Sequence, residues 1–243
     1  METAPLMHFS YEPSGVLSVE LHAHSARSHD GVDPIETLLE HAQTRGLDAL
    51  AVTDHDAIDA SLRAVDLAPA YGLVGIPGIE VSSHAGHVLA LGVDRLVPSG
   101  LPFEETVARI HDAGGTAVVP HPFQKLRKGV LAHVDPEALV VADAIEVYNS
   151  RWLTGRTNRQ ACDLAVELGM PMTAGSDAHV AEMVGQAATL VDADQHDADA
   201  ILAAICEGRT AIDGRRTPFR VTFRQAAGTA RRRARRTTER YLR

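Results

Sequence analysis

Apolar and polar residues alternate in several short stretches of the chain, and this pattern predicts β-strands. The stretch 16–21 (VLSVEL) alternates and is rich in valine and leucine, as in a strand with one buried face. Short apolar runs bounded by glycine, proline or polar residues predict further strands that are buried on both faces. The predicted strands are 16–21, 48–53, 73–81, 87–92, 116–120, 144–148 and 171–175.

Helical patterns separate most of these strands. The sequence Asp33-Pro34-Ile35-Glu36 is typical of a helix start, with Asp33 as the N-cap and Pro34 in the first helical position, and Gly46 ends that helix. Further helices are predicted at about 58–70, 103–113 and 157–168, the last one capped by Gly169. The strands 73–81 and 87–92 follow each other too closely for a helix to intervene.

Strands that alternate with helices predict an α/β fold with a largely parallel sheet. Polar residues that could carry chemistry follow the C-terminal ends of at least five predicted strands. An open, doubly wound sheet places its ligand at one switch point, whereas a barrel gathers all its strand ends around one site. The sequence therefore favours a barrel over a doubly wound sheet.

Histidines two residues apart end the first predicted strand. In a strand His22 and His24 point to the same face, while Leu21 and Ala23 point to an apolar layer. Asp177 and His179 repeat this spacing after the last predicted strand. A single such pair fits two solvated or hydrogen-bonded histidines as well as a metal site, so the prediction depends on the whole set. Collected by strand, the candidate ligands are His22, His24, Asp30, His55, Glu80, His87, His121, Asp177 and His179, with His84 as an alternative to His87.

The net charge of −9 hides two parts of opposite sign. Residues 209–243 contain twelve arginines and only two acids, a local charge of +10, which leaves −19 on residues 1–208. The acidic, lysine-poor body resembles proteins adapted to high salt, and drift in a GC-rich genome explains it equally well. Like charges packed so densely repel each other, so 227–243 is expected to be a solvated helix or a disordered extension.

Cysteine usage and hydropathy exclude several classes of protein. Cys162 and Cys206 both fall in helical patterns, so neither a disulfide framework nor a thiolate zinc site is predicted. No apolar run approaches the length of a membrane span, and the N-terminus lacks the pattern of a signal peptide. A cytoplasmic location is expected, and any metal must be bound by His, Asp and Glu.

Five ordered motifs resemble the PHP (polymerase and histidinol phosphatase) superfamily of metal-dependent phosphoesterases. They are LHAHS with SHDG, AVTDHD, PGIEVSS followed by GHVLALG, VVPHPF, and AGSDAH, and the resemblance covers residues from about 17 to 191. The resemblance implies a distorted (β/α)7 barrel, a site that commonly holds three divalent ions, and the nine candidates above as ligands. Many members have Ser-Asp-Gly where this chain inserts His29 between Ser28 and Asp30, so His29 is an alternative to Asp30.

The resemblance also suggests an organisation of the chain. A stand-alone PHP hydrolase domain is expected at 16–214, preceded by an N-terminal arm (1–15) and followed by a basic C-terminal extension (215–243). The segment from Ile145 to Arg151 looks like the C-terminal part of stand-alone PHP hydrolases. Within it, Glu146 is either an acceptor that orients a metal-binding histidine or, with Asn149, a support for the loop.

The types of ligand limit which metals and which reactions are expected. Six imidazoles and three carboxylates favour Zn, Mn or Fe over Mg or Ca, and ions a few ångström apart can deprotonate a bridging water that attacks phosphorus. Catalysis is expected to depend on His22, His24, Asp177 and His179. A phosphate also needs cations that do not bind metal, because they neutralise its oxygens. The candidates for this role are Lys125, Arg127, Arg151 and Arg156, with Lys128 in the same loop as the first two.

Three functional hypotheses follow. The first is a phosphoesterase that hydrolyses a small phosphomonoester or nucleotide-type substrate. The second is an exonuclease acting on 3′ or 5′ ends of RNA or DNA, with the Arg-rich tail as a nucleic-acid contact. The third, a non-catalytic metal-binding regulatory domain, is disfavoured by the complete ligand set. Amidohydrolases also begin with HxH on a barrel strand, but this chain has no lysine at a strand end to bridge two metals.

Overall fold

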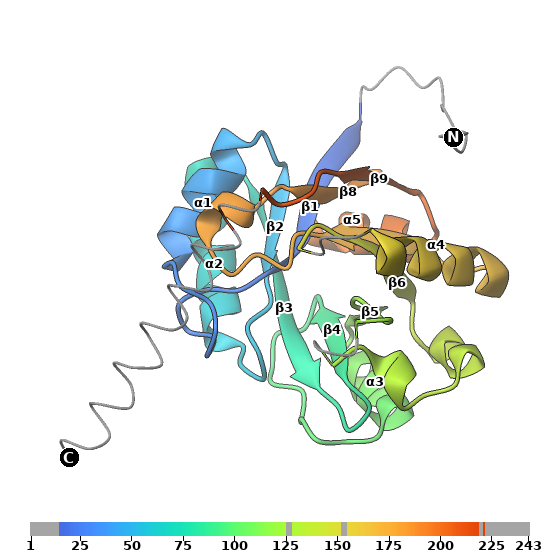
Figure 1. Ribbon diagram of the computed structural model, residues 1–243. Helices are drawn as coiled ribbons and strands as arrows, with labels where there is room; N and C mark the ends of the chain where they lie inside the picture. Colours follow the sequence, from blue (N-terminus) through green and yellow to red (C-terminus); the bar gives the residue numbers. More distant parts are fainter. Residues whose placement is uncertain (1–14, 125–127, 152–154, 219–220, 222–243) are drawn as a thin grey trace, which may run out of the picture.

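A nine-stranded mixed sheet forms the centre of the molecule (Figure 1). The structure is a computed structural model that describes residues 15–124, 128–151, 155–218 and 221. The strand order in the sheet is β7-β6-β5-β4-β3-β2-β1-β8-β9. The strands are β1 (Val16–Ala23), β2 (Ala49–Val52), β3 (Val74–Ser82), β4 (His87–Leu91), β5 (Thr116–Val119), β6 (Ala144–Asn149), β7 (Met172–Gly175), β8 (Ala187–Asp192) and β9 (Thr210–Gly214).

The sheet curls until its first and seventh strands meet, so β1 to β7 form a nearly closed barrel. Ala178, just after β7, bridges in parallel to Ala23 at the end of β1. The His24 amide donates to the Ala178 carbonyl (2.7 Å), and the Ala178 amide donates to the His22 carbonyl (3.2 Å). The predicted barrel is confirmed, and the doubly wound alternative is wrong. Strands β8 and β9 continue the sheet from the first half of β1, where β8 pairs antiparallel.

Helices surround the barrel because their apolar faces pack on the outward side chains of the strands. They are α1 (Ile35–Thr44), α2 (Asp59–Leu67), α3 (Phe103–Asp112), α4 (Arg156–Leu168) and α5 (Ala198–Cys206). Leu50 and Val52 of β2 share one apolar cluster with α1 and α2. Ile201 and Ile205 of α5 belong to another cluster, which contains alternate residues of β1, β2 and β4. No described helix is both long and apolar enough to cross a membrane.

Two local predictions are wrong for identifiable reasons. Asp33 does not cap α1, because its carboxylate accepts a hydrogen bond from the Ala181 amide (2.7 Å) and Pro34 takes the N-cap position. Leu21 and Ala23 do not share one apolar layer but join different clusters. The register with β2 shifts between Glu20 and Ala23, and such a bulge breaks the two-residue alternation of side chains.

The predicted strands and helices are present within a few residues of their expected ends, whereas β8 and β9 were not predicted and α5 was indicated only by the helical pattern around Cys206. The strands β3 and β4 form an antiparallel hairpin, as their short separation implies. Both cysteines are free thiols. The expected N-terminal arm, except Gly15, and the expected solvated tail 227–243 lie outside the described residues. The division of the chain at 214 stays a prediction.

Candidate metal centre

The candidate ligands lie at one end of the barrel because each is attached to a strand end there. His22 lies near the end of β1 and His24 directly follows it, while His121 follows β5 and Asp177 follows β7. The parallel strands deliver residues at their C-terminal ends, and His87 opens β4 at the same end because β4 is antiparallel to its neighbours. The remaining candidates are Asp30 in the loop after β1, His55 after β2, Glu80 on β3 and His179 after β7.

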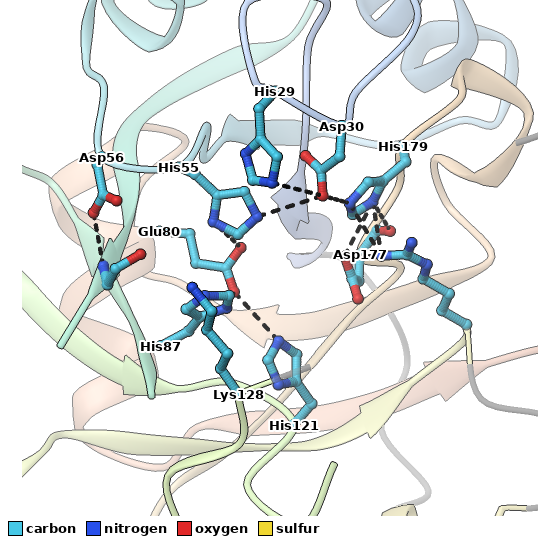
Figure 2. Close-up of a pocket in the computed structure, with 12 residues that line it drawn as sticks. His29, Asp30, His55, Asp56, Glu80, His87, His121, Lys128, Asp177 and His179 are labelled. Atoms are coloured by element: carbon cyan, nitrogen blue, oxygen red, sulfur yellow. Dashed lines mark hydrogen bonds and ion pairs between the residues drawn. The ribbon is translucent and has the colours of Figure 1, made fainter. Parts of the chain in front are cut away.

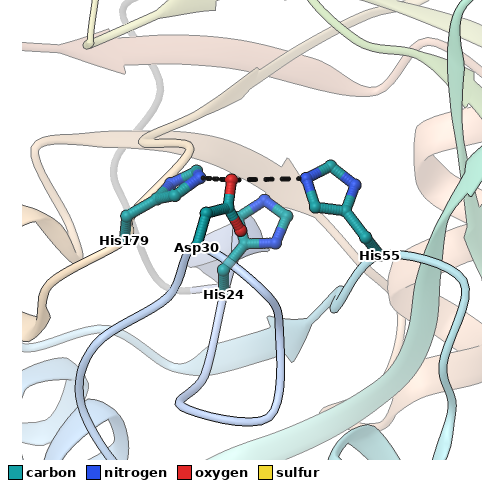
Figure 3. A group of neighbouring side chains, drawn as sticks. All are labelled: His24, Asp30, His55 and His179. Atoms are coloured by element: carbon teal, nitrogen blue, oxygen red, sulfur yellow. Dashed lines mark hydrogen bonds and ion pairs between the residues drawn. The ribbon is translucent and has the colours of Figure 1, made fainter. Parts of the chain in front are cut away.

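All nine candidates come together in four overlapping groups whose ligand atoms lie within 4.8 Å of one another. Figure 2 shows most of them converging on one pocket, and Figure 3 shows the group around Asp30. The groups are His24, Asp30, His55 and His179; His22, His24 and Asp177; His22, Glu80 and His121; and His55, Glu80 and His87. The structure thus brings together every residue of the predicted ligand set.

Glu80 lies in the middle of the cluster and faces histidines with both carboxylate oxygens. Its Oε2 lies 3.1 Å from Nε2 of His24, 3.3 Å from Nδ1 of His55 and 3.4 Å from Nε2 of His22. Its Oε1 lies 2.7 Å from Nδ1 of His87 and 3.3 Å from Nε2 of His121. A carboxylate whose two oxygens face different sets of histidines could hold two cations, one through each oxygen.

The geometry discriminates between the two pairs of alternatives. Asp30 Oδ2 lies 2.7 Å from His179 Nε2 and 3.6 Å from His55 Nε2, whereas the His29 side chain is 60% exposed. His29 lines the pocket and its Nε2 lies 3.9 Å from Asp30 Oδ2, but it belongs to none of the four groups. His84 is exposed, while His87 is buried among the candidates. The arrangement favours Asp30 and His87.

Two candidates have strained backbones. His121 has φ of 34° and Asp177 has φ of 49°, in the left-handed region that side chains other than glycine rarely adopt. Such a conformation costs on the order of 1 kcal/mol and persists only where the surroundings enforce it. Here the turn redirects a side chain from the end of β5 or β7 into the shared pocket.

A group of buried acceptors holds the candidates in place from behind. Glu146 Oε1 lies 3.0 Å from His22 Nδ1, and Glu146 Oε2 accepts from the His121 amide and from the Asn149 side chain, both at 3.0 Å. Both readings of Glu146 therefore agree with the contacts, because one carboxylate orients a histidine and supports the loop. Sequence reasoning missed the matching role of Asp54, whose carboxylate accepts from the Ser25 amide (2.7 Å) and hydroxyl (2.6 Å).

Glu20 is a second residue that sequence reasoning missed. It is fully buried and accepts hydrogen bonds from the amides of His22 (3.1 Å), Ser176 (2.9 Å) and Gly185 (3.1 Å). Burial raises the pKa of Glu20 to about 7, although these bonds favour its charged form. The available signal was an acid inside an otherwise apolar strand, two residues before His22.

Burial and neighbouring charges act together on the pKa values of His55, His179 and Glu80. Burial opposes the charged form of His55, yet Glu80 and Asp30 outweigh it and raise the pKa of His55 to about 9. Burial, the Arg151 guanidinium and His24 lower the pKa of His179 to about 4. Burial likewise disfavours the ionised form of Glu80, but the surrounding histidines, His87 first, hold its pKa well below the usual range. The Glu80 carboxylate is thus charged at neutral pH, and bound cations would balance this charge.

The donor set fits divalent metal ions. Nε2 of His22 and both ring nitrogens of His24 are buried and make no hydrogen bond with any described residue, which is costly for polar atoms. Two ligand atoms bound tetrahedrally to one ion at about 2.1 Å are about 3.4 Å apart. Nε2 of His22 and of His24 lie 3.4 and 3.1 Å from Glu80 Oε2, and 3.9 and 3.6 Å from Asp177 Oδ1, close to that spacing.

A pocket of about 360 Å³ opens above the candidates. Arg151 lines it, with Nη1 3.1 Å from Asp177 Oδ1 and 3.0 Å from His179 Nδ1. Lys128 lines it from the loop after β5 (Figure 2). Arg156 is exposed at the start of α4 and does not belong to the described lining. Lys125 and Arg127 lie outside the described residues.

Comparison with known proteins identifies the family to which this chain belongs. Residues 20–142 match the PHP domain family, and residues 155–210 match the PHP-associated family. An uncharacterized protein of Methanocaldococcus jannaschii is 30% identical over 175 residues, which cover 70% of this chain and 69% of that protein. The chain belongs to the PHP family. PHP proteins of this kind are metal-dependent phosphoesterases, and the buried clusters of His, Asp and Glu agree with a PHP-type multinuclear metal site.

Shorter matches and solved structures widen this comparison. The chain is 38% identical over 86 residues to the phosphoribosyl 1,2-cyclic phosphate 1,2-diphosphodiesterase of Eggerthella lenta, and 33% identical over 86 residues to the 3′,5′-nucleoside bisphosphate phosphatase of Chromobacterium violaceum. These matches cover 33% and 34% of this chain, and 32% and 30% of the relatives.

The same PHP fold occurs in two solved structures. One is a two-domain Bacteroides vulgatus protein with a predicted PHP-like metal-dependent phosphoesterase (TM-score 0.69, 21% identity, 82% of this chain and 65% of that one). The other is Endonuclease Q bound to a duplex with an abasic lesion (TM-score 0.56, 16% identity, 82% of this chain and 58% of that one).

Proton release on metal binding is expected for this PHP protein. A histidine must be neutral to bind a metal, and His55, with its pKa near 9, is mostly protonated at pH 7. Apparent metal affinity should therefore rise with pH up to about 9, by roughly tenfold per unit for each proton released. Calorimetric titration at pH 7 in two buffers of different ionisation enthalpy measures this release. His55→Ala should reduce the number of protons released by about one, while His84→Ala should not change it; metal binding without proton release would contradict the assignment.

Proposed function

We propose that this PHP protein hydrolyses a small phosphomonoester or nucleotide-type substrate, using three divalent ions of the Zn, Mn or Fe class. The observation that carries the proposal is the division of nine buried or half-buried candidate ligands into sets around three carboxylates. Each imidazole binds one ion in this assignment, while a carboxylate can serve two.

The contacts support one partition of the ligands. Glu80 would hold the first ion through Oε2, which faces His22 and His24, and the second through Oε1, which faces His87 and His121. His55 Nδ1 also lies 3.3 Å from Oε2. The first ion takes His22, His24 and Asp177; the second takes His87 and His121; the third takes Asp30, His55 and His179. Imidazole and carboxylate without thiolate suit the borderline divalent metals.

The protein's own residues bind and orient the substrate in this proposal. Divalent ions, when bound, lower the pKa of a coordinated water and neutralise charge on phosphate oxygens. His22, His24, Asp177 and His179 act by holding the ions. Arg151 is the best candidate for a phosphate ligand, because it is largely buried beside Asp177 and its planar fork matches two phosphate oxygens. Lys128 supplies a second positive charge in the pocket.

A substrate panel tests the proposal. Protein loaded with Zn, Mn or Fe would be assayed with phosphomonoesters, nucleotides and short oligonucleotides, each with and without a chelator. The proposal expects turnover of at least one small phosphoester that stops on chelation. Activity confined to oligonucleotides would favour the second candidate, and no hydrolysis of any phosphoester by fully loaded protein would contradict both.

Cleavage of nucleic-acid ends is the second candidate function. The observation that favours it is a group of exposed arginines near the loop that carries Arg151. Arg156 and Arg159 lie one turn apart on α4, Arg216 lies next to Gly155, and none of these three pairs with an acid among the described residues. Against it, residues 1–208 carry a charge of −19, which repels a polyanion. A steep loss of oligonucleotide affinity with rising salt, absent in an Arg156→Gln, Arg159→Gln and Arg216→Gln variant, would support this candidate.

Deleting residues 229–243 is expected to leave turnover of a small phosphoester within about threefold, roughly 0.65 kcal/mol in the barrier. The deletion removes no candidate ligand and none of the described residues that line the pocket. Steady-state kinetics of the truncated protein, with its metal content measured in parallel, provides the test. Loss of small-substrate activity with the metals retained would assign the tail to the site, and the boundary at 214 would then be wrong.

A further inference from the structure

The chain that follows β9 passes beside the loop that carries Arg151. After Gly214 the Arg215 amide donates to the Gln186 carbonyl (2.6 Å), and the next residues continue toward the end of β6. Thr217 is only 5% exposed, although it lies between the exposed residues Arg216 and Pro218. We call residues 215–218 the C-terminal strap. A buried polar residue in an otherwise exposed segment indicates a specific contact.

Thr217 makes that contact with Ser150, the residue before Arg151. The Thr217 amide donates to the Ser150 carbonyl (3.0 Å), and the two hydroxyl oxygens lie 3.0 Å apart. The Ser150 hydroxyl also donates to the Ser176 carbonyl (3.3 Å). A hydroxyl has one hydrogen, so with Ser150 donating to Ser176, the Thr217 hydroxyl donates to Ser150.

The resulting chain of hydrogen bonds ends on two residues that each directly precede a pocket residue. Ser150 precedes Arg151 and Ser176 precedes Asp177, and Arg151 Nη1 lies 3.1 Å from Asp177 Oδ1. The Ser150 amide donates to the Gly175 carbonyl (3.2 Å), which joins the same two backbones a second time. The strap therefore contacts the backbone of Arg151's loop at the point where it adjoins the metal-binding turn after β7.

We propose that Thr217 is a positioning residue that sets the place of Arg151 relative to Asp177, and thereby the fit of the substrate's phosphate. This inference rests on the proposed function, in which Arg151 binds phosphate beside the metals. Thr217 itself lines no part of the described pocket. Its contribution is positional, and displacement of a binding group by about 1 Å can cost up to 100-fold in rate.

The position of Thr217 explains why the effect should fall on substrate binding rather than on the metals. Its hydrogen bonds reach Ser150 and, through Ser150, Ser176, and none of these three residues belongs to the candidate ligands. Asp177 is also held by the turn after β7, whereas Arg151 follows Ser150 directly and precedes a segment that joins α4 at Arg156. Loosening the strap should therefore shift Arg151 more than Asp177.

Thr217→Val tests the proposal, because valine keeps the shape of threonine and removes only the hydroxyl. With the metal-loaded full chain, KM for a small phosphomonoester should rise about five- to tenfold and kcat should stay within twofold. The inhibition constant of inorganic phosphate should rise by the same factor, with metal content unchanged. Thr217→Ser restores the hydroxyl and should lie within twofold of the wild type.

Thr210→Val is the matched control. Its hydroxyl, also on the chain around β9, donates to the Met172 carbonyl (2.7 Å) at the opposite end of β7. This variant should leave KM and phosphate inhibition within twofold of the wild type. An unchanged KM in Thr217→Val, or an equal rise in KM in Thr210→Val, would overturn the proposal. So would a loss of metal from Thr217→Val, because it would show a general loosening of the barrel.

A second readout separates this proposal from the proposed function. If the wild type hydrolyses no phosphoester, the proposed function fails, and the strap is then tested by titrating inorganic phosphate into metal-loaded protein and by amide hydrogen exchange. The Ser150 and Arg151 amides should exchange at least tenfold faster in Thr217→Val than in the wild type, and phosphate should bind more weakly. Unchanged exchange at both amides would overturn the positioning role whatever the activity.

Discussion

Replacing Asp177 with asparagine is expected to lower phosphoester turnover by about 10³-fold, roughly 4 kcal/mol in the barrier, with the fold retained. The Asp177 carboxylate lies 3.9 Å from His22 Nε2, 3.6 Å from His24 Nε2 and 3.2 Å from His179 Nδ1. Asparagine keeps the shape of this side chain but removes the charge that a cation requires. It also tolerates the left-handed backbone at this position.

Asp56→Asn is the matched control for that substitution. Asp56 lines the same pocket and has φ of 51°, but its carboxylate accepts from the Ser82 amide (2.7 Å) and belongs to none of the four ligand groups. We expect the control to keep turnover within about fivefold. His22→Ala should match Asp177→Asn in its loss of activity. More than a few per cent of activity in either variant, with metal content unchanged, would show that these residues do not bind the metals.

Replacing Glu80 with glutamine is expected to remove two of the three ions and to abolish turnover. Glu80 contacts His22, His24 and His55 through Oε2, and His87 and His121 through Oε1, so it would serve two ions in the proposed partition. The glutamine amide is uncharged and has a single oxygen. Its nitrogen cannot bind a cation, so the histidines on that side would lose their shared carboxylate ligand. Metal analysis of the purified variant measures the effect directly.

Glu80→Asp separates the charge of this residue from its reach. Aspartate keeps the negative charge but is shorter by one methylene, so its carboxylate cannot contact both sets of histidines. The variant should keep more metal than Glu80→Gln and still lose most of its activity. If Glu80→Gln kept three ions per chain, the bridging assignment would be wrong, even with the remaining ligands correct.

The barrel and the candidate ligands could both be predicted from the sequence, and for the same physical reason. Each candidate is attached to a short apolar strand, and parallel strands deliver their C-terminal residues to one end of a barrel. His87 followed the same rule through its hairpin, because an antiparallel strand begins where its partner ends. Predicting strand ends therefore indicated which parts of the chain meet, but the choices between Asp30 and His29 and between His87 and His84 stayed open until the structure.

Features that depend on tertiary contacts were not predictable in this way. Asp33 has the sequence context of a helix cap, yet a contact with the Ala181 amide uses its carboxylate. Arg151 and Arg156 were equivalent candidates in the sequence, and only the path of the loop separates a pocket residue from an exposed one. The burial of Thr217 likewise depends on a partner 67 residues away in the chain.

The most direct test of the central claim is the metal content of the protein measured together with its phosphoesterase activity. The purified protein would be stripped by a chelator, reloaded in steps with Zn, Mn or Fe, and assayed at each step while bound metal is measured by mass spectrometry. We expect three ions per chain at saturation, no activity in the stripped protein, and activity that returns as the ions bind. Fewer than two ions per chain, with phosphoester hydrolysis undiminished by chelation, would contradict the central claim.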